Sequence, residues 1–69
     1  MKIKMNVWIT RDEYSTLWLH GKRPEKEDDF FCTPDGFNEI VPREITKFFD
    51  DITFENSPKE FTITFTPKN

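Results

Sequence analysis

Few side chains in this sequence could do chemistry, and their spacing is poor for catalysis. The chain has one histidine, His20, and one cysteine, Cys32. Nucleophilic catalysis needs a Ser, Cys or Thr within hydrogen-bond reach of a base, and Cys32 belongs to an apolar segment. The adjacent acids at 28–29 and 50–51 point in different directions on a strand or helix, so neither pair is suited to sharing a proton. We therefore expect no enzyme and no catalytic residue.

Metal and cofactor sites are not expected either. A structural zinc site takes four sulfur or nitrogen ligands, which one cysteine and one histidine cannot supply. Gly21 and Gly36 are the only glycines, too few for a glycine-rich phosphate loop. The sequence therefore predicts no metal and no cofactor, and leaves binding as the chemistry to look for.

The residues best suited to binding are the two tryptophans. Tryptophan is a preferred anchor of protein interfaces and a stacking platform for bases. Lysines and threonines on the same face of the neighbouring segments could contact the anionic groups of a ligand. The candidate binding residues are Trp8, Trp18, His20, Lys2, Lys4 and Thr64.

Alternating strands must position these side chains. Residues 2–10 and 16–20 alternate apolar and polar residues with period two, which is typical of strands with one buried face. The polar turn between them predicts an antiparallel hairpin centred near Glu13. That centre places Trp8 opposite Trp18, as a cross-strand aromatic pair.

The rest of the chain predicts a small α+β domain over residues 1–69. Residues 22–29 read as an exposed loop, 30–33 as a short strand, 34–36 as a turn and 61–66 as a last strand. Ile45, Phe48, Phe49 and Ile52 recur at helical spacing after Pro42, which favours one α-helix. We expect an antiparallel sheet of three to five strands with this helix packed on one face, in the order β-β-β-α-β.

The alternation divides the predicted sheet into two faces. The helix should cover a core face, which collects Ile3, Met5, Val7, Ile9, Leu17, Leu19, Phe61, Ile63 and Phe65. The outer face collects the lysines at 2 and 4, the threonines of the last strand, both tryptophans and His20. Because one helix cannot reach both faces, the outer face is the expected binding surface.

The chain is short for a domain that folds alone. It has 69 residues, and below roughly 70–80 residues a single core rarely supplies more than about 3–5 kcal/mol without a disulfide, a metal or a partner. One cysteine excludes an intrachain disulfide. We therefore expect a partner chain, either in a homodimer or larger oligomer or in a complex with another protein.

Charge is distributed unevenly along the chain. Residues 1–26 carry six Lys/Arg and three acids, whereas residues 27–57 carry two and nine. A nucleic-acid-binding domain is usually basic with clustered Lys/Arg, so we do not expect direct nucleic-acid binding. The first residues hold no long apolar run, so we expect no leader and no membrane span, and a cytoplasmic location.

Several motifs resemble a class of short accessory proteins encoded by phages and prophages. The matching features are a strand ending in Trp-x-x-Arg-Asp at 8–12, Leu-Trp-Leu at 17–19, Lys-Arg-Pro at 22–24, and an acidic-aromatic run closed by Ser-Pro at 48–58. The chain departs from the class in lacking a glycine after Asp12 and in having Phe30 and Phe31 where Trp is common. The resemblance implies a setting in which small proteins bind and block host factors, antiviral defence systems among them.

These features together favour a phage-type accessory protein of the host bacterial cytoplasm. We expect it to inhibit a host factor, an antiphage defence component, by direct non-catalytic binding. The acidic middle of the chain could then mimic nucleic-acid phosphates on a basic host surface.

Two alternatives remain open. The first is a sponge that sequesters a nucleotide signal or another small anionic ligand, with Trp8 and Trp18 as stacking anchors and Lys2, Lys4 and His20 near the phosphates. The second is a purely structural homo-oligomeric subunit whose Trp face closes a dimer.

Overall fold

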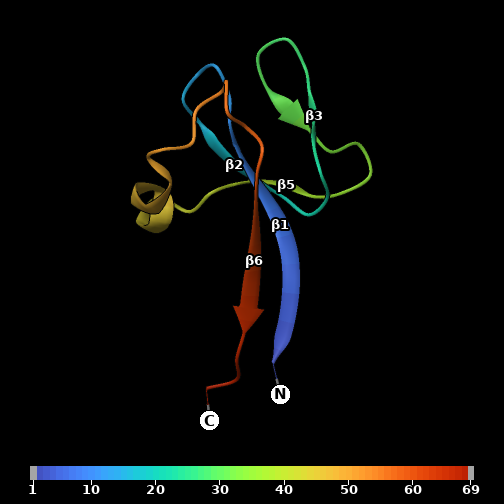
Figure 1. Cartoon of the computed structure of the whole chain (residues 1–69), viewed down its shortest axis with the longest axis vertical. Helices are drawn as coiled ribbons and strands as arrows, with labels where there is room; N and C mark the ends of the chain where they lie inside the picture. The colour runs from blue at the N-terminus through green and yellow to red at the C-terminus, as the bar shows by residue number, and fades with distance from the viewer. Residues whose placement is uncertain (1, 69) are drawn as a thin grey trace.

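A mostly antiparallel sheet with little helix forms the fold, as the alternation predicts. The computed structural model describes residues 2–68, and its elements are β1 (Ile3–Arg11), β2 (Leu17–His20), β3 (Glu25–Lys26), β4 (Phe31–Cys32), β5 (Asn38–Ile40), the 3-10 helix η1 (Arg43–Phe49) and β6 (Lys59–Phe65). Four strands form one sheet in the order β5-β2-β1-β6, while β3 and β4 form a separate hairpin. Figure 1 shows β1 and β6 leaving the other elements together and running to the two chain ends.

The β1–β2 hairpin has a different register from the predicted one. Trp8 is opposite His20, and Thr10 is opposite Trp18, so the prediction that Trp8 faces Trp18 is wrong. The turn is centred on Tyr14 because the Asp12 carboxylate accepts hydrogen bonds from the backbone N–H groups of Tyr14 and Thr16, each at 2.9 Å. This shift by two residues in pairing leaves every side chain on its predicted face.

The turn itself depends on one residue in a left-handed conformation. Ser15 N–H donates to Asp12 O at 3.1 Å, and Asp12 N–H donates to Thr16 O at 3.0 Å. Ser15 has φ 70°, a conformation that glycine adopts most readily. A three-residue loop ending in such a residue is a common hairpin connection, and it lies one residue further along the chain than the sequence suggested.

The hydrophobic core lies at the end of the sheet where all four strands meet. Ile9, Leu17, Val41 and Ile52 form the buried cluster, with Leu19 and Phe49 packed against it. Val41 follows β5, a strand that the sequence analysis did not predict. The loop predicted at 22–29 contains β3, which pairs with β4.

The other half of the β1–β6 pair is a two-stranded ribbon that this core does not include. β1 pairs with β6 from Ile3↔Phe65 to Ile9↔Lys59, whereas β2 reaches only as far as Trp8. The core prediction for four residues of this ribbon is therefore wrong. Their exposed fractions are 57% for Ile3, 36% for Met5, 37% for Phe61 and 52% for Phe65.

The predicted α-helix is instead the short 3-10 helix η1, which buries none of its residues. Its helical hydrogen bonds run from i to i+3, as in Ile45 N–H to Pro42 O at 3.1 Å, so residues three apart lie above one another. Ile45 and Phe48 consequently stay 40% and 68% exposed. The segment has no alanine and contains Thr46, so its intrinsic preference for an α-helix is low.

Arg11 fixes the segment that follows η1. Its guanidinium donates from Nε to Ile52 O at 2.6 Å and from Nη2 to Phe49 O at 3.1 Å. Phe49 O also accepts from Ile52 N–H at 3.0 Å, so these bonds connect β1 to the chain just after the helix and hold Ile52 in the core. No helix of residues 2–68 is long and apolar enough to cross a membrane.

Candidate functional site

His20 is buried and belongs to the structure rather than to an exposed binding surface. The residue has 0% exposure. Asn38 Oδ1 accepts from Thr33 N–H at 2.9 Å, and Asn38 Nδ2 donates to Thr33 O at 3.0 Å, which fixes the amide orientation. His20 Nδ1 must then donate to Asn38 Oδ1, 2.6 Å away. In the neutral ring, Nε2 accepts from the Thr10 hydroxyl at 2.8 Å.

Burial also determines the charge of this ring. Desolvation lowers the pKa of His20 below 6.5, and the hydrogen bond with Asn38 offsets only part of the effect. The ring is therefore neutral near pH 7, and a cationic contact from His20 to a phosphate is not favoured.

The two tryptophans occupy different surroundings. Trp18 is half-buried on β2, and its Nε1 donates to Asp12 Oδ2 at 2.9 Å. Trp8 is half-buried on β1, and its buried Nε1 has no hydrogen-bond partner among residues 2–68. Because a carboxylate adjoins the Trp18 indole, the surroundings of Trp18 disfavour a phosphate.

The remaining predicted binding residues lie on the ribbon. Lys2, Lys4 and Thr64 are exposed, and Lys4 is opposite Thr64. The alternation places them on the same sheet face as Trp8, which lies four residues further along β1 than Lys4, about 13 Å at strand spacing. The six predicted residues therefore share a face without forming one compact site.

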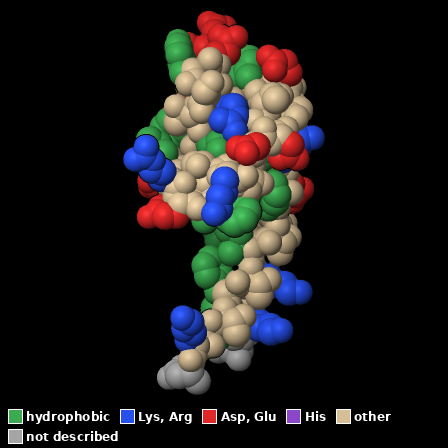
Figure 2. Space-filling view, turned by 90° about the vertical axis from the view of Figure 1, so that its left-hand side faces the viewer, with side chains coloured by type: hydrophobic (Ala, Val, Ile, Leu, Met, Phe, Trp, Pro, Cys, Tyr) green, Lys and Arg blue, Asp and Glu red, His purple; other side chains and the backbone are tan. Residues whose placement is uncertain are grey.

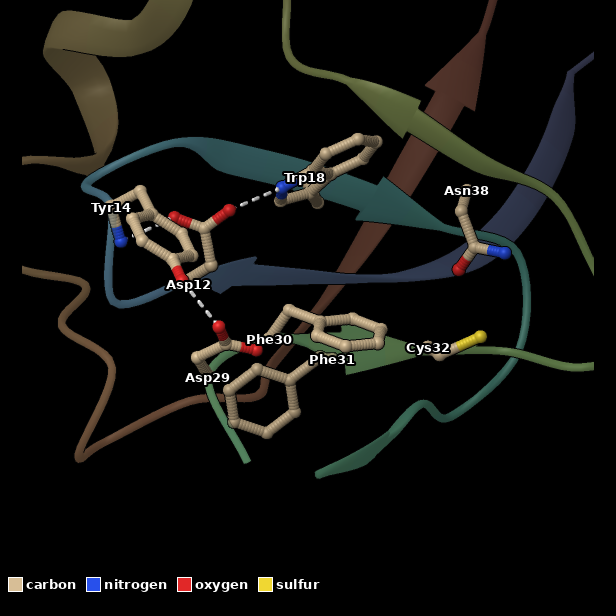
Figure 3. A pocket seen from close by; sticks show the side chains of 8 residues that line it. All are labelled: Asp12, Tyr14, Trp18, Asp29, Phe30, Phe31, Cys32 and Asn38. Atoms are coloured by element: carbon tan, nitrogen blue, oxygen red, sulfur yellow. Dashed lines mark hydrogen bonds between the residues drawn. The ribbon is translucent and has the colours of Figure 1, made fainter. Parts of the chain in front are cut away.

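A cleft separates β2 from the β3–β4 hairpin and has an apolar lining with two carboxylates. It encloses about 500 Å³, within the range of small-molecule sites. Figure 3 shows Trp18 on one wall, Phe30 and Phe31 on the other, and Asp12 with Asp29 at one end. We call it the hairpin cleft, and its lining residues are Asp12, Tyr14, Trp18, Asp29, Phe30, Phe31, Cys32 and Asn38.

Hydrogen bonds hold the two walls of the hairpin cleft together at its acidic end. Glu13 N–H donates to Asp29 O at 3.0 Å, and the Tyr14 hydroxyl donates to the Asp29 carboxylate. This bond, together with the charge of Asp29, raises the pKa of Tyr14 above 10.0. Within residues 2–68 the ion pair is Lys22–Asp35, so neither cleft carboxylate is paired with a basic side chain.

The second candidate is the apolar side of the ribbon, which we call the ribbon face. Its residues are Ile3, Met5, Phe61, Ile63 and Phe65, and the register brings them to one side of the β1–β6 pair. Figure 2 shows hydrophobic side chains continuing from the larger end of the molecule down this stem, with lysines at its sides.

A groove extends the ribbon face toward η1. It encloses about 180 Å³ between the sheet and the helix. Its lining includes Val7 and Ile9 of β1, Phe61 and Ile63 of β6, and Phe49 of η1. The exposed apolar surface therefore ends in a depression large enough for part of a side chain.

The sequence analysis predicted neither the hairpin cleft nor the exposure of the ribbon face. Asp12 could have been found from its place directly before a turn, where an aspartate commonly bonds to the backbone two residues on. Asp29, Phe30 and Phe31 gave no such signal, because the cleft depends on how two hairpins pack. Among residues 2–68, no group of three or more His, Cys, Asp or Glu side chains is placed to hold a metal ion.

Comparison of the chain with models of known protein families, with curated proteins and with solved structures gave no match.

Proposed function

We propose that the chain is a non-catalytic binding protein that docks its ribbon face on another protein and inhibits it. The observation that carries this proposal is the exposure of the ribbon face, where Ile3 and Phe65 are more than half exposed. A two-stranded ribbon is marginally stable in water by itself, and an exposed apolar patch of this kind marks an interaction site in many proteins.

Charge around the ribbon face specifies the chemistry of the partner. Lys59 is exposed on the side of the ribbon face, and Lys2, Lys4 and Glu60 are exposed on the polar face of the same two strands, with Lys68 just beyond them. A partner surface with an apolar centre and an acidic rim would complement this arrangement. The groove beside η1 would take an apolar side chain of the partner, as anchor residues at interfaces fill pockets.

The sequence indicates which class of protein the partner belongs to. The resemblance to short phage and prophage accessory proteins supports a bacterial host factor, an antiphage defence component, as the inhibited partner. The nucleotide sponge has less support, because His20 is buried in its neutral form and Asp12 adjoins Trp18. The purely structural homo-oligomer is expected to close through its Trp face. A second copy on the ribbon face would compete directly with the proposal, and solution mass separates a homo-oligomer from it.

The test compares two variants that add the same charge to opposite faces of the ribbon. Phe65→Glu places a carboxylate on the ribbon face, whereas Thr64→Glu places one on the polar face. The wild-type chain and the Thr64→Glu variant should capture the same bacterial protein from lysate, and Phe65→Glu should lose it. Adding purified wild-type chain to that protein should then lower its activity, while adding the Phe65→Glu variant should not.

Three results would overturn the proposal. One is capture that is equal for both variants, and another is a captured protein whose activity does not change. The third is a wild-type dimer that Phe65→Glu dissociates and Thr64→Glu leaves intact, because a second copy would then occupy the ribbon face.

A further inference from the structure

The hairpin cleft lies on the sheet face opposite the ribbon face and plays no part in the proposed docking. Trp18 belongs to the outer face by its register with Thr10, while the ribbon-face residues belong to the core face. A ligand in the cleft would therefore leave the ribbon face free, and each site can be tested without the other.

We propose that the hairpin cleft binds a guanidinium group, as carried by an arginine side chain. The first argument is charge. Asp12 is 7% exposed, and its two oxygens accept from Tyr14 N–H, Thr16 N–H and Trp18 Nε1. These donors are neutral, so no basic side chain is paired with this carboxylate at the end of an apolar cleft.

Asp29 adds a second negative charge at the same end. One of its oxygens accepts from the Tyr14 hydroxyl, another neutral donor. The Tyr14 backbone N–H also donates to the Asp12 carboxylate, so one residue donates hydrogen bonds to both carboxylates. Two anions without a basic partner make this end of the cleft attractive to a cation and repellent to a phosphate or carboxylate.

The aromatic walls decide which kind of cation fits. Cations are attracted to the faces of aromatic rings within about 6 Å of the centroid, and the Phe31 ring already has the Lys26 ammonium 5.9 Å from its centroid. That lysine lies closer to Phe54, at 4.2 Å, and is outside the cleft lining. Phe31 is 4% exposed and packs edge-on against Phe54, so Trp18 and Phe30 supply most of the accessible ring surface along the cleft (Figure 3).

A guanidinium uses both parts of such a site. Its plane stacks on aromatic rings, and its N–H groups match carboxylate oxygens. The cleft volume of about 500 Å³ accommodates the apolar stem of an arginine as well as its head. A hydrated metal ion would use the carboxylates but gain nothing from the aromatic walls.

The test measures binding of blocked arginine, N-acetyl-arginine amide, by amide chemical shifts of the wild-type chain. Its matched control is N-acetyl-citrulline amide, which has nearly the same shape and no charge. Blocked arginine should shift the amides of the cleft residues in a saturable way, and the citrulline compound should bind at least about fivefold more weakly. Equal binding of the two compounds, shifts confined to other residues, or no shifts would overturn the proposal.

Two variants locate the charge that matters. Asp29→Asn removes one of the two cleft carboxylates and keeps an oxygen that can accept from Tyr14, whereas Asp28→Asn removes the adjacent exposed acid. Both change the net charge equally. Asp29→Asn should weaken arginine binding about fivefold and Asp28→Asn by less than about twofold. Equal effects of the two variants would contradict a site at the cleft, and the wild-type comparison with citrulline stands if Asp29→Asn does not fold.

A comparison with one more compound, butylguanidine, distinguishes two sources of the guanidinium group. Tighter binding of blocked arginine than of butylguanidine would assign the site to an arginine within a protein or peptide. Equal binding would assign it to a free guanidinium compound. Both results support the cleft as a guanidinium site.

Discussion

Two of the buried polar side chains, Thr10 and His20, belong to a hydrogen-bond network that extends through Asn38 to the backbone of the buried Thr33. Satisfied buried polar groups specify a structure, whereas a buried donor or acceptor without a partner costs about 1–3 kcal/mol. The network therefore joins β1, β2 and β5 of the sheet to Thr33, which directly follows β4 of the separate hairpin.

The burial of His20 predicts how stability depends on pH. Because its pKa is lower in the folded chain than 6.5, the unfolded chain binds more protons once the pH falls toward and below that value. The free energy of unfolding should therefore decrease as the pH is lowered from about 7.5 to about 5.5. Urea denaturation at several pH values measures this decrease in the free energy of unfolding.

Direct titration of the His20 ring provides the control for this prediction. Titration of the His20 ring signals by NMR should give a midpoint below 6.5 in the folded chain. A midpoint at or above that value would contradict the neutral, buried assignment.

Arg11 predicts a loss of stability from a single substitution. Its guanidinium donates to carbonyls of Ser15, Phe49 and Ile52, and hydrogen bonds from charged groups contribute about 1.5–3 kcal/mol each. Arg11→Met should lower the free energy of unfolding by about 2–3 kcal/mol, allowing for partial exposure of the group. Arg11→Lys should restore little, because an ammonium lacks the planar set of donors.

Urea denaturation checks this effect against Arg23→Met, a substitution at an exposed position. That variant should change stability by less than about 0.5 kcal/mol. Equal effects of Arg11→Met and Arg23→Met would show that the guanidinium does not hold the segment after η1.

At the scale of the elements, the β1–β2 turn makes a prediction through Ser15. Its φ of 70° is unfavourable for a residue with a Cβ atom, so Ser15→Gly should raise the free energy of unfolding by about 0.5–1 kcal/mol. Ser15→Ala keeps the Cβ atom and should give no such gain. A loss of stability with glycine, measured by thermal or urea denaturation, would contradict the turn geometry.

The helices and strands also show which parts of the fold could be predicted from the sequence. Period-two alternation predicted β1, β2 and β6 correctly, because each has a strict apolar face. The spacing of Ile45, Phe48, Phe49 and Ile52 suggested an α-helix, but only Ile52 is fully buried. Hydrophobic spacing does not reveal that Arg11, far away in sequence, binds the carbonyls of Phe49 and Ile52.

The candidate sites were less predictable than the strands. Alternation assigned Trp8, Trp18 and His20 to one face, and the register confirms that assignment. It could not show that His20 is buried beside Asn38 of β5, because β3 and β5 are too short to give a pattern. The prediction that the ribbon residues belong to the core was wrong for a related reason, because alternation identifies an apolar face but not the element that covers it.

At the scale of the whole molecule, the chain has two dissimilar ends. The Cα atoms extend over 44 Å along the longest axis and 16 Å along the shortest, with the ribbon forming one end (Figure 1). Lysines surround the ribbon, while the acids of residues 27–55 belong to the larger end (Figure 2). The central proposal is that the basic, apolar ribbon and not the acidic end contacts the inhibited protein.

Hydrogen exchange of the chain, free and bound to its captured partner, tests that proposal most directly. In the free chain, the amides of residues 3–5 and 63–65 should exchange faster than those of β2, because no further element covers this end of the ribbon. In the complex, the ribbon amides should become protected while those of residues 27–40 exchange as before. Protection gained at residues 27–40 with an unchanged ribbon would contradict the proposal.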